Sequence, residues 1–259
     1  MTTPQFDIRP SLIKGDPADA YLHWTKEVMR LESLNPKVLM DFSTPYPGVL
    51  CGVEEAKALL LNVLPKVEQD RQANNGGDIV QVWAMEEGEK FEAGEPVLRV
   101  IAKYASFGLY ETSILGMLSS SSGWATASNE CVEAAGETTV IAYGARHIHP
   151  NVAHILDYAS VVGGCSSVST ILGSKHAGRN PLGNMPHSLP LLFGDTVAAA
   201  QAFDKHIGME TQRIVVVDTF KDEAEESLNV AEALRDRLRG IRLDTPAERG
   251  GVTPMLVKE

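Results

Sequence analysis

The chain has 259 residues, of which 44% are hydrophobic, and its formal net charge is −11. This length and apolar content suffice for one large core or two smaller ones. The acidic balance argues against a non-specific nucleic-acid binder, because such proteins need a basic face.

Other global features narrow the class of protein further. No apolar run reaches the roughly 18 residues that a membrane span requires. The opening MTTPQFDIRP is neither basic nor followed by an apolar stretch, so it does not read as a secretory signal. Cys51, Cys131 and Cys165 are widely spaced and odd in number, which suits neither a zinc pair nor a disulfide framework. We therefore expect a reduced cytoplasmic protein without a membrane or nucleic-acid partner.

The first part of the chain predicts a small α/β layer. Residues 17–33 form an amphipathic pattern with Pro17 suited to a first helical turn, and 52–66 predict a second helix interrupted by Pro65. KVLMDFS (37–43) predicts a strand, and QANNGG (72–77) is a strong turn signal. The segments IVQVWAM, KFEAG and EPVLRVIAKY then alternate apolar and polar residues, as short strands do.

The pattern changes near residue 113, and from there strands alternate with helices. The expected strands are TTVIAYGAR (138–146), CSSVSTILG (165–173), RIVVVDTF (213–220) and GIRLDT (240–245). The expected helical stretches are 151–164, 187–207 and 222–240, with a further helix beginning in VTPMLVKE. Alternation of this kind predicts a parallel sheet, and strands that are apolar on both faces fit it.

The predicted domains are 1–113, an α/β sandwich, and 114–259, a partial (β/α) barrel. About four or five strands can be counted, whereas a closed barrel of this type needs eight. We therefore expect a fragment of a longer protein, and the alternative is a small open α/β sheet.

Several polar residues follow the predicted strands, where barrel enzymes place their sites. Arg146 presents a guanidinium that can grip a carboxylate or phosphate, or it is a rim arginine paired with an acid. Asp218 and Asp244 are suited to ribose hydroxyls or Mg²⁺, although aspartate in such a place is also a common helix N-cap. His147 and His149 are two residues apart and point to opposite sides of an extended segment, which argues against a metal site.

Residues 173–189 add three further candidates. His187 lies in GNMPHS, where it is a candidate nucleophile or general acid–base, or an ordinary capping residue. Lys175 and Arg179 lie in a predicted Gly-rich loop that can cradle phosphate, although loops are often basic.

These motifs together resemble the nicotinate phosphoribosyltransferase family. The resemblance rests on segments in the family's order that cover nearly the whole chain: ADAYLHWTKE, GEPVLRV, YETSILGMLS, GARHIHP, VSTILGSKHAG, GNMPHSL, VDTFKDEAEESL and RLDTPAERGG. It implies an α/β fold, in which an α+β sandwich domain joins the irregular, incomplete barrel of the type II phosphoribosyltransferases. The activity it implies is transfer of phosphoribosyl from phosphoribosyl pyrophosphate to nicotinate, giving nicotinate mononucleotide and pyrophosphate in NAD biosynthesis, coupled to ATP, with Mg²⁺ as cofactor.

The resemblance also implies roles for individual residues. Tyr21 resembles a tyrosine that reaches into the partner's site in a homodimer and stacks on the pyridine ring. Tyr143 resembles the aromatic residue on the opposite ring face, with Arg146 beside it. His187 matches the histidine that ATP phosphorylates. The remaining implied assignments are acids at the ribose and metal (Asp218, Asp244) and further substrate contacts (Thr219, Lys175, Arg179).

The sequence departs from the family's pattern in three places, and two alternative functions stay open. Asn184 stands where the family usually has threonine, the later phosphate-binding loops are absent, and GGCSSVST is uncharged where nicotinamide-using relatives carry an acid.

One alternative function is that of quinolinate phosphoribosyltransferase, which shares fold and chemistry. The other is a biotinyl- or lipoyl-like binding module, whose hairpin tip needs a lysine where this chain has Ala84-Met85-Glu86.

Overall fold

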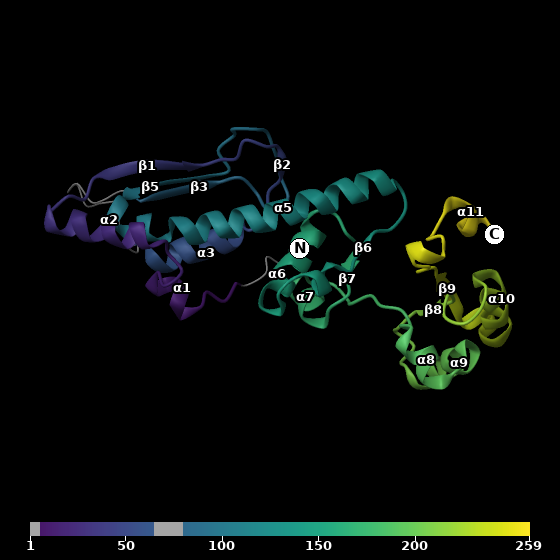
Figure 1. The fold of residues 1–259 in the computed structure, drawn as a ribbon. Helices are drawn as coiled ribbons and strands as arrows, with labels where there is room; N and C mark the ends of the chain where they lie inside the picture. Colours follow the sequence, from purple (N-terminus) through teal and green to yellow (C-terminus); the bar gives the residue numbers. More distant parts are fainter. Residues whose placement is uncertain (1–5, 65–79) are drawn as a thin grey trace. The chain divides into compact units, whose positions relative to one another are not determined.

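The computed structural model describes residues 6–64 and 80–259, shown in Figure 1. The predicted turn at 72–77 and the interruption at Pro65 lie outside the described residues. The chain divides into two compact units, Met1–Pro181 (unit 1) and Leu182–Glu259 (unit 2).

Unit 1 begins with the predicted β-layer. Its three-stranded antiparallel sheet has the order β1-β5-β3, and a second pair joins β2 and β4. The strands are β1 (Lys37–Phe42), β2 (Gly48–Val49), β3 (Gln81–Ala84), β4 (Lys90–Phe91) and β5 (Leu98–Lys103). Alternate residues of β5 (Leu98, Val100 and Ala102) are buried, because successive side chains of a strand point to opposite faces. On the other face Arg99 donates two hydrogen bonds to Asp41 of β1, at 2.6 and 2.7 Å.

Helices pack along one side of this sheet (Figure 1). They are α1 (Pro10–Lys14), α2 (Ala20–Leu31), α3 (Val53–Val63), α4 (Tyr104–Phe107), η1 (Gly108–Tyr110) and α5 (Glu111–Ala135). The shared core contains the fully buried Leu59, Phe107 and Ile114. The two predicted helices are confirmed, but Pro17 precedes α2 and does not form its first turn.

Helix α5 was not predicted from the sequence, because its serines and glycines have weak helix propensity. Here packing overrides propensity: Ser122 Oγ exchanges 3.0 Å hydrogen bonds with the backbone of Cys51. A Cβ at Gly52 would collide with the Met117 carbonyl oxygen, so small residues permit a close approach. The predicted domain boundary at 113 stays a prediction, and this 25-residue helix runs through it.

The rest of unit 1 is a parallel βαβ segment, as predicted. Strands β6 (Ile141–Ala142) and β7 (Ser167–Val168) are paired in parallel and are far shorter than the expected strands. Between and after them come η2 (Gly144–His147), α6 (Pro150–Val162) and α7 (Ile171–His176).

Unit 2 has a second parallel pair, β8 (Arg213–Val216) and β9 (Leu238–Arg242). Its helices are α8 (Ser188–Phe193), α9 (Thr196–His206), α10 (Glu223–Leu234), η3 (Arg235–Arg237), η4 (Ala247–Arg249) and α11 (Pro254–Lys258). Val215, Val216 and Val217 are completely buried against Met185 and α10. The predicted alternation of strands and helices is therefore confirmed, and the fold is α/β.

Two predicted helix bounds in unit 2 were wrong. The stretch 187–207 is two helices, because Gly194 adopts a left-handed conformation (φ 74°) that ends α8. In the stretch 222–240, the helix ends at Leu234, and the last residues belong to β9.

No helix in the described part of the chain is long and apolar enough to cross a membrane.

Candidate active site

The candidate site in unit 2 forms where β8 and β9 end. Val216 pairs with Arg242 in the parallel register, and Asp218 and Asp244 each follow two residues later. Equal spacing from paired residues brings the two carboxylates to the same edge of the sheet. We call this group, with His187, the β8–β9 edge.

A third segment brings His187 to this edge. Met185 forms an isolated parallel bridge with Val215, and its N–H donates to the Ile214 carbonyl at 2.9 Å. His187 then stands immediately before α8, in the irregular segment that the sequence predicted. Its side chain makes no capping hydrogen bond, so the capping alternative is wrong.

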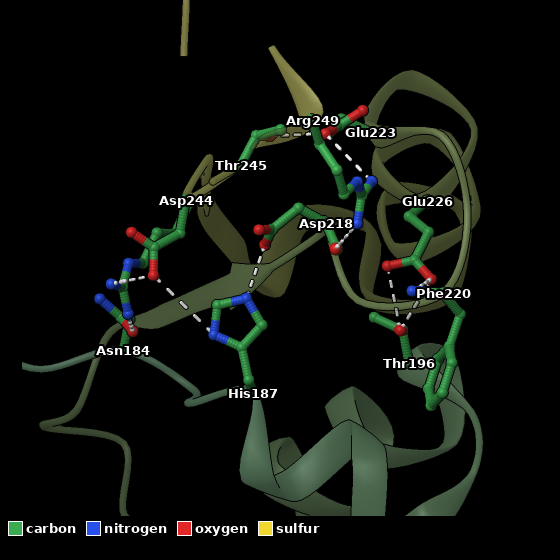
Figure 2. A network of polar contacts seen from close by, with 11 residues as sticks. Asn184, His187, Thr196, Asp218, Phe220, Glu223, Glu226, Asp244, Thr245 and Arg249 are labelled. Atoms are coloured by element: carbon green, nitrogen blue, oxygen red, sulfur yellow. Dashed lines mark hydrogen bonds and ion pairs between the residues drawn. The ribbon is translucent and has the colours of Figure 1, made fainter. Parts of the chain in front are cut away.

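The imidazole of His187 lies between two carboxylates (Figure 2). His187 Nε2 is 2.9 Å from Asp218 Oδ1, and Nδ1 is 3.9 Å from Asp244 Oδ2. An ionised carboxylate only accepts hydrogen bonds, so Nε2 carries the proton and donates to Asp218. In the neutral ring the lone pair therefore lies on Nδ1, on the side that faces Asp244.

The two aspartates have different surroundings. The Asp218 side chain is only 2% exposed, and its backbone carbonyl accepts a 3.1 Å hydrogen bond from Arg249. The Asp244 side chain is 45% exposed and accepts a 2.6 Å bond from Arg242. The N-cap alternative is wrong for Asp218, because Asp222 caps α10. One carboxylate thus orients the histidine, while the other faces solvent.

Further contacts hold in place the loops that follow β8 and β9 and carry the two aspartates (Figure 2). Glu223 accepts a hydrogen bond from Thr245, which follows β9, and lies 3.6 Å from Arg249. Glu226 accepts from the Thr196 hydroxyl at 3.0 Å and from the Phe220 N–H at 3.3 Å. These buried acids of α10 tie down the loops that carry the aspartates. Sequence reasoning did not identify them, although the DEAEE run after β8 contains both.

Two sequence expectations at this edge have specific outcomes. Asn184, one of the departures from the resemblance, accepts a 3.1 Å hydrogen bond from Arg242 and so supports the arginine that pairs with Asp244. The hydroxyl of Thr219 is buried and has no hydrogen-bond partner among the described residues. An unpaired buried hydroxyl beside Asp218 is available to a ligand, which suits its predicted role.

The predicted pyridine-binding residues lie in unit 1, just after β6. Tyr143 is half-buried, and Arg146 is exposed in the short turn η2. No acid among the described residues pairs with Arg146, so its alternative role as a paired rim residue is not seen there. The turn rests on Trp124, because a Cβ at Gly144 would collide with that ring and only glycine fits. We call Tyr143 and Arg146 the β6–β7 edge.

The location predicted for Lys175 and Arg179, a Gly-rich loop, was wrong in part. Lys175 lies within α7, near its C-terminal end, and Arg179 follows that helix. Thr170 begins α7 by accepting a 3.0 Å hydrogen bond from the Gly173 N–H, and this cap extends the helix into the predicted loop. Contact of Lys175 and Arg179 with phosphate stays a prediction.

Tyr21 is exposed on α2, as a residue that reaches another subunit would be. Its side chain is more than half exposed, and its hydroxyl donates to Asp19 at 3.3 Å. The negative charge of Asp19 raises the pKa of the Tyr21 hydroxyl.

Among the described residues, no three His, Cys, Asp or Glu side chains cluster as a metal site.

Two family models match the chain almost end to end. Residues 19–122 match the N-terminal domain of quinolinate phosphoribosyl transferase, and residues 124–256 match its C-terminal domain. The chain belongs to this phosphoribosyltransferase family. The N-terminal match runs through the hairpin that resembled a biotinyl or lipoyl carrier, so the carrier alternative has no support.

Curated relatives and solved structures agree with this family. The chain is 29% identical to nicotinate phosphoribosyltransferase pncB2 of Mycobacterium tuberculosis and 27% identical to the nicotinate phosphoribosyltransferase of Bacillus subtilis, each over 63% of this chain. It spans only 36% and 34% of those proteins.

Among solved structures, the Pyrococcus furiosus nicotinate-nucleotide pyrophosphorylase matches with a TM-score of 0.87 and 39% identity, over all of this chain and 64% of that one. The human nicotinic acid phosphoribosyltransferase shares the fold, with a TM-score of 0.64 and 19% identity over 88% of this chain and 61% of that one.

Proposed function

We propose that this chain is part of a nicotinate phosphoribosyltransferase. The reaction joins nicotinate to the ribose of phosphoribosyl pyrophosphate and releases pyrophosphate, giving nicotinate mononucleotide. The observation that carries the proposal is His187 held between Asp218 and Asp244 in a family member. Cytoplasmic location belongs to the same proposal, and the three cysteines are free, which suits it.

The two carboxylates suit the charge that develops in this reaction. Breaking the bond from ribose to pyrophosphate builds positive charge on the sugar, which carboxylates stabilise. Asp218 Oδ2 and Asp244 Oδ1 accept no hydrogen bond from the described residues, so each aspartate has an oxygen for a ribose hydroxyl. The same oxygens fit Mg²⁺, which proteins bind through one or two carboxylates together with substrate phosphates. When bound, Mg²⁺ offsets charge on the leaving pyrophosphate.

We assign coupling with ATP to Nδ1 of His187. Its lone pair attacks the γ-phosphorus of ATP, an N–P bond forms, and the bond to the bridging oxygen breaks as ADP leaves with that electron pair. The proton on Nε2 stays in its hydrogen bond to Asp218, whose negative charge offsets the positive charge on the ring. Later attack of water on phosphorus restores the histidine.

Nicotinate recognition is assigned to the β6–β7 edge. Arg146 contacts the carboxylate and Tyr143 stacks on the ring, with Tyr21 of the second subunit of a homodimer on the other face. Because the protein is acidic overall, the anionic substrates need a local basic cluster, for which Arg146, Lys175 and Arg179 are the candidates.

Substrate choice is tested on the full-length protein with phosphoribosyl pyrophosphate and either nicotinate or quinolinate. We expect nicotinate mononucleotide from nicotinate, increased by ATP. The second candidate function, suggested by both family models, is quinolinate phosphoribosyl transfer. Quinolinate has one more carboxylate than nicotinate, so its conversion to the same product must release CO₂. CO₂ release with no turnover of nicotinate would replace the proposal with the second candidate.

The histidine is tested separately with γ-labelled ATP, quenched at alkaline pH because phosphohistidine is acid-labile. The wild type should carry label that acid removes, and His187→Ala should carry none while keeping slow, ATP-independent transfer. Equal labelling of both proteins would remove His187 from the mechanism.

A further inference from the structure

Unit 1 contains a cavity of about 640 Å³ that no proposed site residue lines. Its walls come from residues 6–17, the first half of α5 and the helices α6 and α7, with Glu55 of α3. A cavity of this volume lies within the range of small-molecule sites, roughly 300–1,000 Å³.

Unpaired polar atoms gather on this cavity. In the described part of the chain, five buried side-chain polar atoms have no hydrogen-bond partner, and four of them belong to residues that line it. They are Ser113 Oγ, Ser121 Oγ, His154 Nδ1 and His176 Nε2. Ser121 is only 1% exposed. Buried polar groups are nearly always paired, so four unpaired atoms on one cavity indicate hydrogen bonds completed by a ligand.

The two histidines give this wall an uncharged, aromatic character. Burial lowers the pKa of both His154 and His176, which favours their neutral forms. The His176 ring makes edge-on contacts with the rings of Phe6, Tyr158 and His154, at centroid distances of 5.2, 5.4 and 5.6 Å. Such a cluster favours a further aromatic ring over a flexible chain.

The chemistry of the wall limits the ligand. Hydroxyls and neutral imidazoles both donate and accept hydrogen bonds, as do the edges of a heteroaromatic base. Asp7, Arg9 and Glu55 also line the cavity, but Asp7 and Arg9 are exposed, and burial raises the pKa of Glu55, which favours its neutral form. An ion held in the interior would therefore lose its water without gaining a buried opposite charge. A metal is disfavoured because the described residues offer no third ligand beside the histidines.

We propose that this cavity binds an uncharged nucleobase or nucleoside, held by Ser113, Ser121, His154 and His176. The proposal is independent of which pyridine substrate the enzyme uses.

Calorimetric titration of the full-length protein with adenosine and with uridine tests it. At least one should bind saturably, and Ser121→Ala and His176→Phe should each weaken binding at least about fivefold, the effect of one lost hydrogen bond. The matched control is Ser120→Ala, because that neighbouring hydroxyl already donates to the Gly116 carbonyl at 2.6 Å. His187→Ala should bind as the wild type does, because His187 does not line this cavity.

Both test variants replace an unpaired polar atom with an apolar one, so their thermal unfolding without ligand should occur no lower than that of the wild type. With protein labelled with ¹⁵N at histidine, the bound nucleoside should shift the His176 ring nitrogen signals. Absence of saturable binding by either nucleoside would show a cavity filled by water only and overturn the proposal. Affinity unchanged in both test variants, or lost in His187→Ala, would place the nucleoside elsewhere and overturn it too.

Discussion

The β8–β9 edge and the β6–β7 edge present two different kinds of site. At the first, His187 is oriented by Asp218 within hydrogen-bond distance, and buried acids of α10 fix the surrounding loops. At the second, Arg146 is exposed on a short turn, with no acid partner among the described residues. A group that performs covalent chemistry needs its orientation set in advance, whereas a guanidinium that binds an anionic substrate must be left unpaired for it.

The largest effect is expected from Asp218→Asn at the β8–β9 edge. An asparagine offers its amide N–H₂ as readily as its oxygen, so Nε2 no longer has a fixed acceptor and the tautomer of His187 is lost. We expect the ATP-coupled rate constant kcat to fall by about 10²–10⁴, as for other histidines that lose an orienting carboxylate. Measurement of kcat and of the acid-labile label checks this, with circular dichroism to confirm folding. Full labelling would mean that Asp218 does not orient the histidine.

A smaller effect is expected from Arg146→Ala at the β6–β7 edge. The change removes a charge-assisted hydrogen bond worth about 1.5–3 kcal/mol, so the affinity for nicotinate should fall at least tenfold. Phosphorylation of His187 by ATP in the absence of nicotinate should be unchanged, because the two edges have separate tasks. If affinity and turnover stayed at the wild-type level, Arg146 would not be the nicotinate contact.

Mixing two impaired variants tests whether the two edges are completed by a second subunit. Tyr21→Ala and His187→Ala, of which the second keeps only slow, ATP-independent transfer, should recover ATP-coupled activity when the subunits of the full-length proteins exchange. Random pairing makes half of the dimers mixed, each with one intact site, so about a quarter of wild-type activity is expected. With exchange verified by mass spectrometry, zero recovery contradicts a shared site.

The smallest effect is expected at Glu87, a half-buried carboxylate whose contacts are purely structural. It accepts hydrogen bonds from the N–H groups of Gly52 and Val53, at 2.9 and 3.0 Å, at the start of α3. Burial raises its pKa from the ordinary value of 4.5. The folded state therefore binds more protons than the unfolded state, and this contribution to stability is lost as pH rises above about 4.5.

Glu87→Gln removes the titration. The stability of the wild type relative to this variant should therefore decrease as pH rises from 4 to 7, by less than about 2 kcal/mol. Urea unfolding at several pH values measures the difference, and a rising difference would reverse the sign of the argument. Catalysis should be unaffected, in contrast with Asp218.

The sequence by itself determined much of this protein. Hydrophobic periodicity located α2, α3, α6 and α10 and the strands of both units other than β2, because one buried face leaves a regular pattern along the chain. The order of the motifs around Arg146, His187, Asp218 and Asp244 was enough to indicate the phosphoribosyltransferases. The exact pyridine substrate and the Mg²⁺, ATP and dimer assignments stay predictions.

Only the tertiary structure decided the rest. Helix α5 depends on close approaches made by small residues, which periodicity does not record. Whether His187 caps a helix or pairs with Asp218 depends on the register that places residues 187 and 218 at one sheet edge. The four unpaired atoms of the unit 1 cavity come from α5, α6 and α7, and their convergence likewise exists only after packing. In each case residues far apart in sequence interact at short range, and a linear pattern cannot specify which of them meet.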